Sequence, residues 1–353
     1  MGAVDHGLPG SRVTLQDVAD RAGVSITTAS RVVNDGKRRV GAQLARQVRQ
    51  AAAELGYTAN LQARAVATGR SSMVGVVVHD IADPYFSSIA AGLIETASRS
   101  QLLVCLSAAA ANEAAERAYV SLMRAQRARA VILIGSRTGD AAGRAALSAE
   151  VAAFIGQGGR AVCVGQPLLG VDTIAPENAA GAGALARALA GLGHRRFAVL
   201  AGPRASITVQ DRIEGFRAGL GAWSIGLDPA DVVHAAFSRD GGYQAMSAIL
   251  ASGGELPDCV FAVNDVMAVG ALARLRAAGI SVPGDVAVAG FDDISTLRDV
   301  TPPLTTVRLP LTQMGEMAAN MVLADGDPCR PRVVPVPGEV IMRDSTLPRR
   351  PRG

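Results

Sequence analysis

The stretch "VTLQDVADRAGVSITTASRVVN" (residues 13–34) decides how the folded part of the chain begins. Its first apolar residues recur at i, i+3, i+4 and i+7, as in the buried stripe of a helix, at Leu15, Val18, Ala19 and Ala22. Thr14 can cap this helix, with Asp17 three residues on as a capping-box partner, and Gly23 ends it. The sequence therefore predicts a short helix that stops at a glycine turn.

A second helix follows Ser25, which can serve as its N-cap. Its narrow buried stripe consists of Ala29, Val32 and Val33. Another face repeats hydrogen-bonding side chains at helical spacing, at Thr27, Ser30, Arg31 and Asn34. Donors and acceptors of these types match base edges in the major groove. Two helices joined by a glycine turn, the second with a polar face, predict a helix-turn-helix.

A third helix is predicted over residues 42–55, and it would complete a small all-α domain. Its inward residues would be Leu44, Val48, Ala51, Ala52 and Leu55, with Arg46 and Arg49 outward. Residues 1–70 hold ten Arg/Lys and five Asp/Glu, net +5, whereas the whole chain has 35 against 31, net +4, so the remainder sums to −1. This excess indicates nucleic acid as the partner, and a solvated basic face is the alternative.

Composition narrows the class of protein. Hydrophobic residues are 49% and charged residues 19% of the 353, as in soluble globular proteins. No apolar run reaches roughly 18 residues, the length of a membrane span. The N-terminus "MGAVDHGLPGSR" lacks the pattern of a secretory signal, so we expect a cytoplasmic protein. The cysteines have no CxxC or Cys/His spacing, so we expect no disulfide, no metal site and no cofactor.

From residue 73 short apolar runs alternate with Ala-rich helical stretches. The runs are "VGVVV" (74–78), "LLVCLS" (102–107), "AVILIG" (130–135), "AVCVG" (161–165), "FAVLAG" (197–202), "CVFAV" (259–263) and "VAVAGF" (286–291). This alternation predicts α/β lobes with parallel sheets, and the number of strands favours two lobes with a cleft between them. Ligands bind at the carboxyl ends of such strands. Those ends carry "HDIADPYF" (79–86), "VNDVMA" (263–268) and "GFDDIS" (290–295).

The segment "TANLQARAVATGRSS" (58–72) joins the two parts. It can form about two turns of helix, which is too short to be stable alone in water. We therefore expect a hinge helix that forms only when it is docked.

The order of these features resembles the lactose-repressor (LacI/GalR) family of bacterial transcription regulators. Besides the opening stretch, the matching motifs are "AAAELGY", "ARAVATGRS", "PYFSSI", "LGHRRFAVLAGP", "DRIEGFRAGL", "FAVNDVMAVGAL", "GFDDI" and "PPLTTVRLPLTQMG". The resemblance implies a homodimer on a palindromic double-stranded operator. Each chain would have a helix-turn-helix, a hinge helix in the minor groove, and a two-lobed effector domain like that of type I periplasmic binding proteins.

The resemblance also implies domain boundaries. Residues 1–11 and 347–353 would be tails, 12–58 the DNA-binding domain, 59–70 the hinge, and 71–346 the effector and dimerisation domain. The N-terminal lobe would hold about 71–172 and 304–333, and the C-terminal lobe about 173–303 and 334–346.

Carried over by position, the resemblance implies which residues contact DNA. Ile26, Thr27 and Arg31 would read bases. Phosphate or supporting contacts would come from Thr14, Ser25, Thr28, Ser30 and Asn34. The hinge residue that wedges into a base step is usually Leu in the family and is Val66 here, a shorter wedge.

In the effector cleft, the resemblance implies a binding set of Tyr85 and Phe86 from one lobe and Arg212, Phe237, Asn264 and Asp292 from the other. Forked donors, carboxylate acceptors and aromatic rings suit a small polyhydroxylated or heterocyclic ligand, with a carbohydrate first among them. Each residue also has a structural interpretation. The rings could be ordinary core residues, Arg212 could pair with Asp211 or Glu214, and Asp292 could cap a turn.

Two other functions compete with this hypothesis. A two-lobed solute-binding protein would share the cleft, but it would need a signal peptide and would have no use for residues 12–70. An enzyme would need a nucleophile with a base, or a metal cluster, whereas His6, His79, His194 and His234 are scattered and no HExxH motif occurs. We therefore expect a non-enzymatic, sequence-specific repressor whose operator affinity is set by a small ligand.

Overall fold

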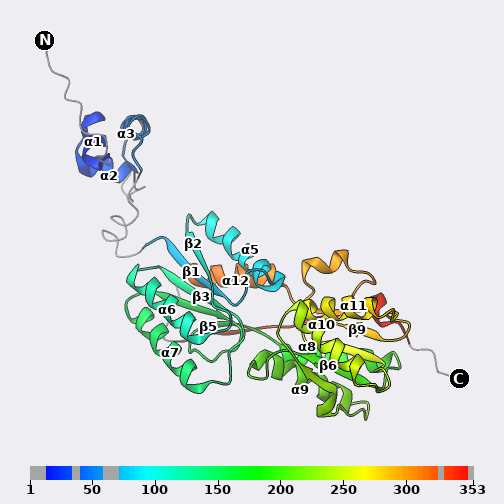
Figure 1. The fold of residues 1–353 in the computed structure, drawn as a ribbon. Helices are drawn as coiled ribbons and strands as arrows, with labels where there is room; N and C mark the ends of the chain where they lie inside the picture. The colour runs from blue at the N-terminus through cyan, green and yellow to red at the C-terminus, as the bar shows by residue number, and fades with distance from the viewer. Residues whose placement is uncertain (1–12, 34–39, 59–70, 325–329, 349–353) are drawn as a thin grey trace. The chain divides into compact units, whose positions relative to one another are not determined.

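The computed structural model describes residues 13–33, 40–58, 71–324 and 330–348. The chain divides into two compact units, Met1–Ser72 and Met73–Gly353 (Figure 1). Each unit buries its own apolar core. Within the described ranges, no helix is both long and apolar enough to cross a membrane.

The described part of the small unit contains the predicted helices α1 (Leu15–Arg21), α2 (Ile26–Val33) and α3 (Ala42–Glu54). Thr14 caps α1 in the predicted capping box. Its backbone N–H donates to Asp17 Oδ2 at 2.8 Å, and the Asp17 N–H donates to Thr14 Oγ1 at 3.3 Å. Ser25 caps α2 by accepting from the Thr28 N–H at 3.2 Å. The local signals of the opening stretch therefore produce the predicted helix, turn and helix.

One inward residue of the third helix was predicted wrongly. The buried residues of α3 are Ala45, Val48 and Ala51, spaced three apart, whereas Leu44 is 37% exposed. Successive residues of a helix point about 100° apart, so a stripe that includes Ala45 turns Leu44 away from the core. Packing against α1 and α2 decides which face of α3 is buried. The sequence prediction, based on hydrophobicity alone, placed the larger Leu44 on the buried face.

The larger unit has two parallel sheets, each at the centre of one lobe. The first lobe has a six-stranded sheet in the order β11-β5-β4-β3-β1-β2, with bounds β1 (Met73–Val78), β2 (Leu103–Ala108), β3 (Ala130–Ile134), β4 (Arg160–Val164), β5 (Asp172–Pro176) and β11 (Val333–Val336). The second lobe has a four-stranded sheet in the order β7-β6-β8-β9, with bounds β6 (Phe197–Ala201), β7 (Val232–His234), β8 (Cys259–Ala262) and β9 (Ala287–Ala289). A small antiparallel pair consists of β10 (Thr306–Arg308) and β12 (Glu339–Ile341).

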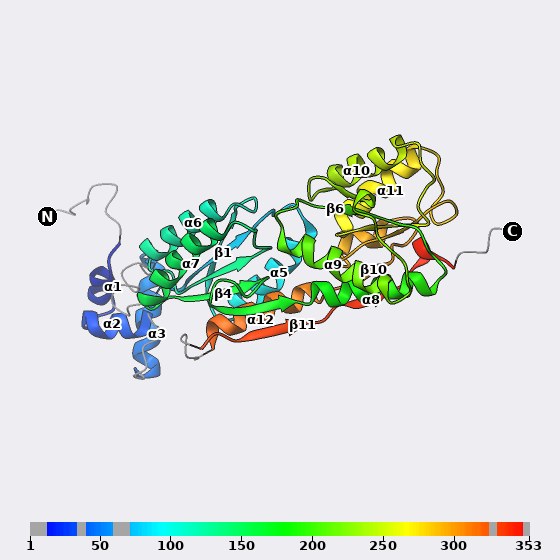
Figure 2. The same cartoon turned by 90° about the horizontal axis from the view of Figure 1, so that it is seen from below.

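Helices cover both faces of each sheet. In the first lobe they are α5 (Pro84–Arg99), α6 (Glu113–Ala125), α7 (Ala141–Gly156) and α12 (Leu311–Leu323). In the second lobe they are α8 (Asn178–Gly191), α9 (Ile207–Gly221), α10 (Arg239–Ala251) and α11 (Asp265–Ala277). Figure 2 shows α6 and α7 on one side of the first sheet, with α5 and α12 on the other. Because both faces are covered, the strands read as continuous apolar runs.

All seven predicted apolar runs form strands. The chain, however, crosses between the two lobes at different residues from those predicted. β5 belongs to the first lobe, so the first crossing comes after Pro176 and not at residue 172. β11 pairs with β5, so the last crossing comes after Val336 and not at residue 333. Thr305 and Arg308 still bridge to the second lobe, so the middle crossing comes after residue 308. "DTIAP" and "VVPV" contain proline and carry no strong strand signal, so only long-range pairing reveals them.

Candidate functional site

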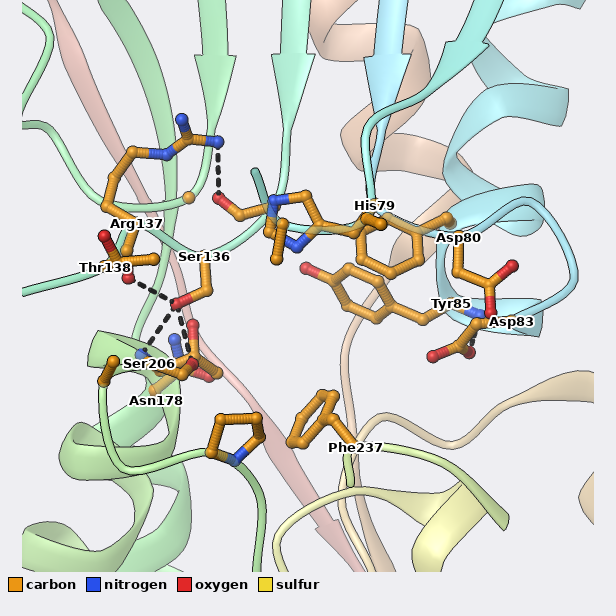
Figure 3. Close-up of a pocket in the computed structure, with 18 of the residues that line it drawn as sticks. His79, Asp80, Asp83, Tyr85, Ser136, Arg137, Thr138, Asn178, Ser206 and Phe237 are labelled. Carbon is orange, nitrogen blue, oxygen red and sulfur yellow. Dashed lines mark hydrogen bonds between the residues drawn. The ribbon is translucent and has the colours of Figure 1, made fainter. Parts of the chain in front are cut away.

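A cavity of about 720 Å³ lies between the two lobes of the larger unit (Figure 3). Its first-lobe wall comes from residues that follow β1, β3 and β4, and its second-lobe wall comes from α9 and from the segments that follow β6, β7 and β9. It therefore lies at the carboxyl ends of the strands, as predicted for an open parallel sheet. Its volume is in the range of small-molecule sites, roughly 300–1,000 Å³.

The cavity brings together five of the six predicted effector residues, namely Tyr85, Phe86, Arg212, Phe237 and Asp292. Asn264 is not among the lining residues. It caps α11, where its Oδ1 accepts from the Met267 N–H at 3.0 Å, and it is 1% exposed. Asn178, at the start of α8, lines the cavity instead.

Arg212 is held in the second-lobe wall by three separate groups. Its Nε donates to Asn178 Oδ1 at 2.9 Å, Nη1 to the Val263 carbonyl at 2.6 Å, and Nη2 to Asp292 Oδ1 at 2.8 Å. The guanidinium also lies over the Phe291 ring, with 3.8 Å from Cζ to the ring centroid. The ion pair is with Asp292, and not with the sequence neighbours proposed as alternatives. This clamp fixes the direction of a buried cation at the cavity wall.

Asp292 has an unusual backbone and an unusual charge. Its φ of 116° lies in a region that non-glycine residues seldom adopt, and its N–H donates to the Val307 carbonyl at 2.8 Å. Burial raises the pKa of Asp292 to about 7, although the Arg212 charge and hydrogen bond act in the opposite direction. The pKa of Asp265 is also raised, first by burial and then by repulsion from Asp292. The Asp292 backbone therefore bridges to Arg308, and its carboxyl group pairs with Arg212.

The first-lobe wall contributes the aromatic side chains Tyr85 and Phe86. Their rings meet edge to face, with centroids 5.0 Å apart at 87°. Asp83 caps α5 by accepting from the Tyr85 N–H at 2.9 Å, which fixes where the helix presents the ring. Burial raises the pKa of Tyr85, so its phenol stays protonated and can donate. Phe237 faces Tyr85 from the second lobe (Figure 3).

Several lining residues were not predicted from the sequence, and they include His79, Arg137 and Asn178. His79 lies within "HDIADPYF", a stretch already assigned to a strand end, and Arg137 follows the run "AVILIG" in the same way. The position directly after a buried strand could therefore have predicted that these two residues line the cavity. Nothing in the spacing indicated that Glu116 of α6, which does not line the cavity, would pair with Arg137.

The two lobes also touch directly beside the cavity. The Gly139 N–H donates to the Ala205 carbonyl at 2.9 Å, and the Ile207 N–H donates to the Arg137 carbonyl at 3.1 Å. Side chains extend this contact, because Ser136 Oγ accepts from the Thr208 N–H at 3.0 Å. A ligand that enters the cavity therefore lies against groups that hold the lobes together.

The small unit presents the predicted base readers to solvent. Ile26, Thr27 and Arg31 are exposed on α2, and Ile26 is 46% exposed despite being apolar. Ser25 and Thr28 Oγ atoms lie 2.9 Å apart, so these two hydroxyls stabilise the start of α2. Thr14 is exposed and Ser30 is half-buried. Asn34, Val66 and the predicted hinge at 59–70 lie outside the described residues.

Comparison with known proteins gives matches for both units. Residues 14–60 match the family model of bacterial regulatory proteins of the lacI family. Residues 186–346 match a periplasmic-binding-protein-like domain.

Among the described residues, no cluster of three or more His, Cys, Asp or Glu side chains could hold a metal ion.

Relatives and solved structures cover nearly the whole chain. The transcriptional regulator DegA of Bacillus subtilis (strain 168) is 30% identical over 96% of this chain and 99% of its own length. GalR of Escherichia coli (strain K12) is 32% identical over 89% of each chain. The Lac repressor dimer bound to operator and the anti-inducer ONPF has a TM-score of 0.81 at 27% identity, over 96% of this chain and all of that one. The regulator CelR in complex with cellobiose has a TM-score of 0.68 at 28% identity, over 95% of this chain and all of that one.

The helix-turn-helix unit, the two-lobed unit and the full-length relatives agree with one another. The chain belongs to the lacI family of bacterial regulatory proteins.

Proposed function

We propose that the protein is a cytoplasmic repressor that binds a palindromic operator as a homodimer and is controlled by a carbohydrate in the cavity. The observation that carries the DNA part is the exposed face of α2, with Ile26, Thr27 and Arg31 free of the core. A guanidinium on such a helix can bind a guanine edge bidentately. Thr14, Ser25, Thr28, Ser30 and Asn34 would contact phosphates or support the helix, and Val66 would wedge into a central base step.

The donors and acceptors of the cavity support the ligand part of the proposal. The Arg212–Asp292 pair can offer a fixed donor and acceptor to vicinal hydroxyls, while Tyr85, Phe86 and Phe237 can pack against the apolar face of a sugar ring. CelR, a related regulator, is solved with cellobiose. A volume of about 720 Å³ holds a ligand of that size class.

The ligand would act by changing how the lobes close. The walls of the cavity come from both lobes, and direct contacts between the lobes lie beside the cavity. A ligand can shift the closure equilibrium only by binding one arrangement more tightly than the other, which gives couplings of roughly 1–3 kcal/mol. In a dimer, closure would change the spacing of the two hinges and thereby the fit to half-sites about one helical turn apart. A solute-binding role is the weaker alternative, because the curated relatives are named as transcriptional regulators.

To test the DNA part, binding sites are first selected from random duplexes with the wild type. The affinities of Arg31→Ala and Arg21→Ala for the selected site and for scrambled DNA are then measured by titration. Both variants remove one positive charge from the small unit, but Arg21 lies on α1 and pairs with Glu54 at 2.7 Å. Arg31→Ala should cost roughly 1–3 kcal/mol on the selected site and relax one base position. Arg21→Ala should weaken selected and scrambled DNA alike. If Arg31→Ala, like Arg21→Ala, lost the same affinity for the selected site as for scrambled DNA, Arg31 would read no base.

A further inference from the structure

A buried ion pair lies behind the first-lobe wall of the cavity. Arg137, which follows β3, is fully buried, and Glu116 of α6 is 1% exposed. Arg137 Nη2 donates to Glu116 Oε1 at 3.0 Å, and Nη1 donates to Oε2. Because both Nη groups are directed to this carboxylate, the positive charge of Arg137 is neutralised within the wall. The charge of Arg137 is therefore paired within the wall, although its buried Nε has no hydrogen-bond partner within the described ranges.

The ring of His79 is fixed against this pair. Its Nε2 lies 3.4 Å from Glu116 Oε1, which is longer than a well-formed hydrogen bond, so the attraction is chiefly electrostatic. The ring packs against Phe86, with centroids 5.5 Å apart. Gly135 has a φ of 147°, and a Cβ there would lie 2.3 Å from His79 Nε2. Only glycine permits the strand end and the imidazole to come so close.

The carboxylate also decides which ring nitrogen of His79 carries the proton. Burial alone would raise the pKa of Glu116, but the hydrogen bonds and charge of Arg137, together with the electrostatic attraction of the His79 ring, outweigh burial and lower it. The carboxylate is therefore ionised and can only accept, so the proton of a neutral imidazole belongs on Nε2. Nδ1 is then an acceptor. Nε2 is buried beside Glu116 without a hydrogen-bond partner among the described residues, whereas Nδ1 is not among the buried atoms that lack one. Figure 3 shows the ring beside Tyr85 and Ser136 at the cavity.

We propose that His79 binds the effector directly, accepting a hydrogen bond at Nδ1 from an uncharged hydroxyl of the ligand, with Glu116 and Arg137 as positioning residues. The neighbouring Asp80 and Asp83 carboxylates also line this wall and also accept. The first-lobe end of the effector is therefore rich in hydroxyl donors and carries no phosphate or carboxylate. This inference rests on the proposed ligand control of the cavity, and it names the chemistry of one end of the ligand.

The tautomer is tested without any ligand, on protein labelled with 15N-histidine. The chain has four histidines, and His79→Asn assigns the resonance of His79. At a pH where the imidazole is neutral, we expect a protonated Nε2 and an unprotonated Nδ1. Glu116→Gln should weaken this preference, which a loss of stability alone would not do. A proton on Nδ1 in the wild type would overturn the proposal.

The ligand contact is tested by thermal shift and calorimetry with ribose, galactose and cellobiose, each beside an anionic counterpart such as ribose 5-phosphate, galacturonate or cellobionate. We expect at least one neutral compound to bind and its anionic counterpart to fail. His79→Leu should weaken that binding roughly tenfold or more, and His79→Asn, which keeps an acceptor near the Nδ1 position, should weaken it less. Tighter binding of the anions, no binding of any neutral compound, or unchanged affinity in His79→Leu would overturn the proposal. Operator binding measured without ligand tests the proposed DNA function separately.

Discussion

Removing Arg212 should destabilise the larger unit by an amount that depends on pH. Arg212→Met keeps an unbranched apolar chain of similar length but leaves Asp292, Asn178 and the Val263 carbonyl without their donor. In the wild type Asp292 is ionised above pH 8, because its pKa is about 7 with Arg212 present. Without Arg212, whose charge and hydrogen bond lower this pKa, the carboxyl group at that pH must either stay ionised without a partner or take up a proton. Leaving a buried carboxylate unpaired costs roughly 3–5 kcal/mol. At pH 5 the same carboxyl group is protonated, so the cost falls to that of unsatisfied acceptors, roughly 1–3 kcal/mol.

The assay is thermal unfolding of wild type and variants at pH 5 and at pH 8.5. For a unit of this size one kcal/mol corresponds to roughly 2–4 °C, so Arg212→Met should lower Tm by roughly 6–20 °C at pH 8.5 and clearly less at pH 5. The double variant Arg212→Met, Asp292→Asn removes both charges of this ion pair and should lose the difference that Arg212→Met shows between the two pH values. Asn also tolerates the positive φ of position 292. An equal loss at both pH values would refute the buried ion pair as the source of the effect.

Three further predictions follow from single contacts. Asp292→Asn should change the pH profile of stability, because the pKa of Asp292 is raised from 3.8 to about 7. The stabilising contribution of this group is full below about pH 4 and is lost as the pH rises through 7, by a few kcal/mol at most. The variant should therefore lack the decline in Tm that the wild type shows over this pH range. Val48→Ala, at a fully buried site, should cost about 2 kcal/mol of stability in the small unit, whereas Leu44→Ala should cost less than about 0.5 kcal/mol, as measured by chemical denaturation. Asn264→Ala should cost about 1 kcal/mol through loss of the α11 cap and leave ligand affinity unchanged in calorimetry, unlike Asn178→Ala.

Local signals in the sequence were sufficient for the helix-turn-helix and for most of the strands. Thr14 and Ser25 cap their helices because the cap is decided within three or four residues. Six of the seven apolar runs form strands that are mostly buried, whereas β2 lies at the edge of its sheet and exposes Leu103 and Leu106. The weak strands β5 and β11 were not predicted from the sequence. β5 pairs with β4 on one side and with β11 on the other, and among the described strands β11 pairs only with β5, about 160 residues away.

The cavity shows where prediction from sequence stops. Tyr85, Arg212 and Asp292 could be placed by motif, but the Arg212–Asp292 bond spans 80 residues and no local pattern indicates it. The same holds for Arg137 and Glu116, which are 21 residues apart and meet only because α6 packs beneath the ends of β1 and β3. A motif identifies which residue type stands at a strand end, and the three-dimensional packing decides what that residue contacts.

The central claim is that a ligand in the cavity sets the affinity of the small unit for DNA. The most direct measurement is a fluorescence titration of the selected operator with and without a saturating neutral compound from the sugar panel, for wild type and for Asp292→Asn. Ligand coupling of roughly 1–3 kcal/mol predicts a 5- to 150-fold change in operator Kd for the wild type. Asp292→Asn should bind the operator normally without the compound and respond little to it. A compound that binds the wild type with an unchanged operator Kd would contradict the account.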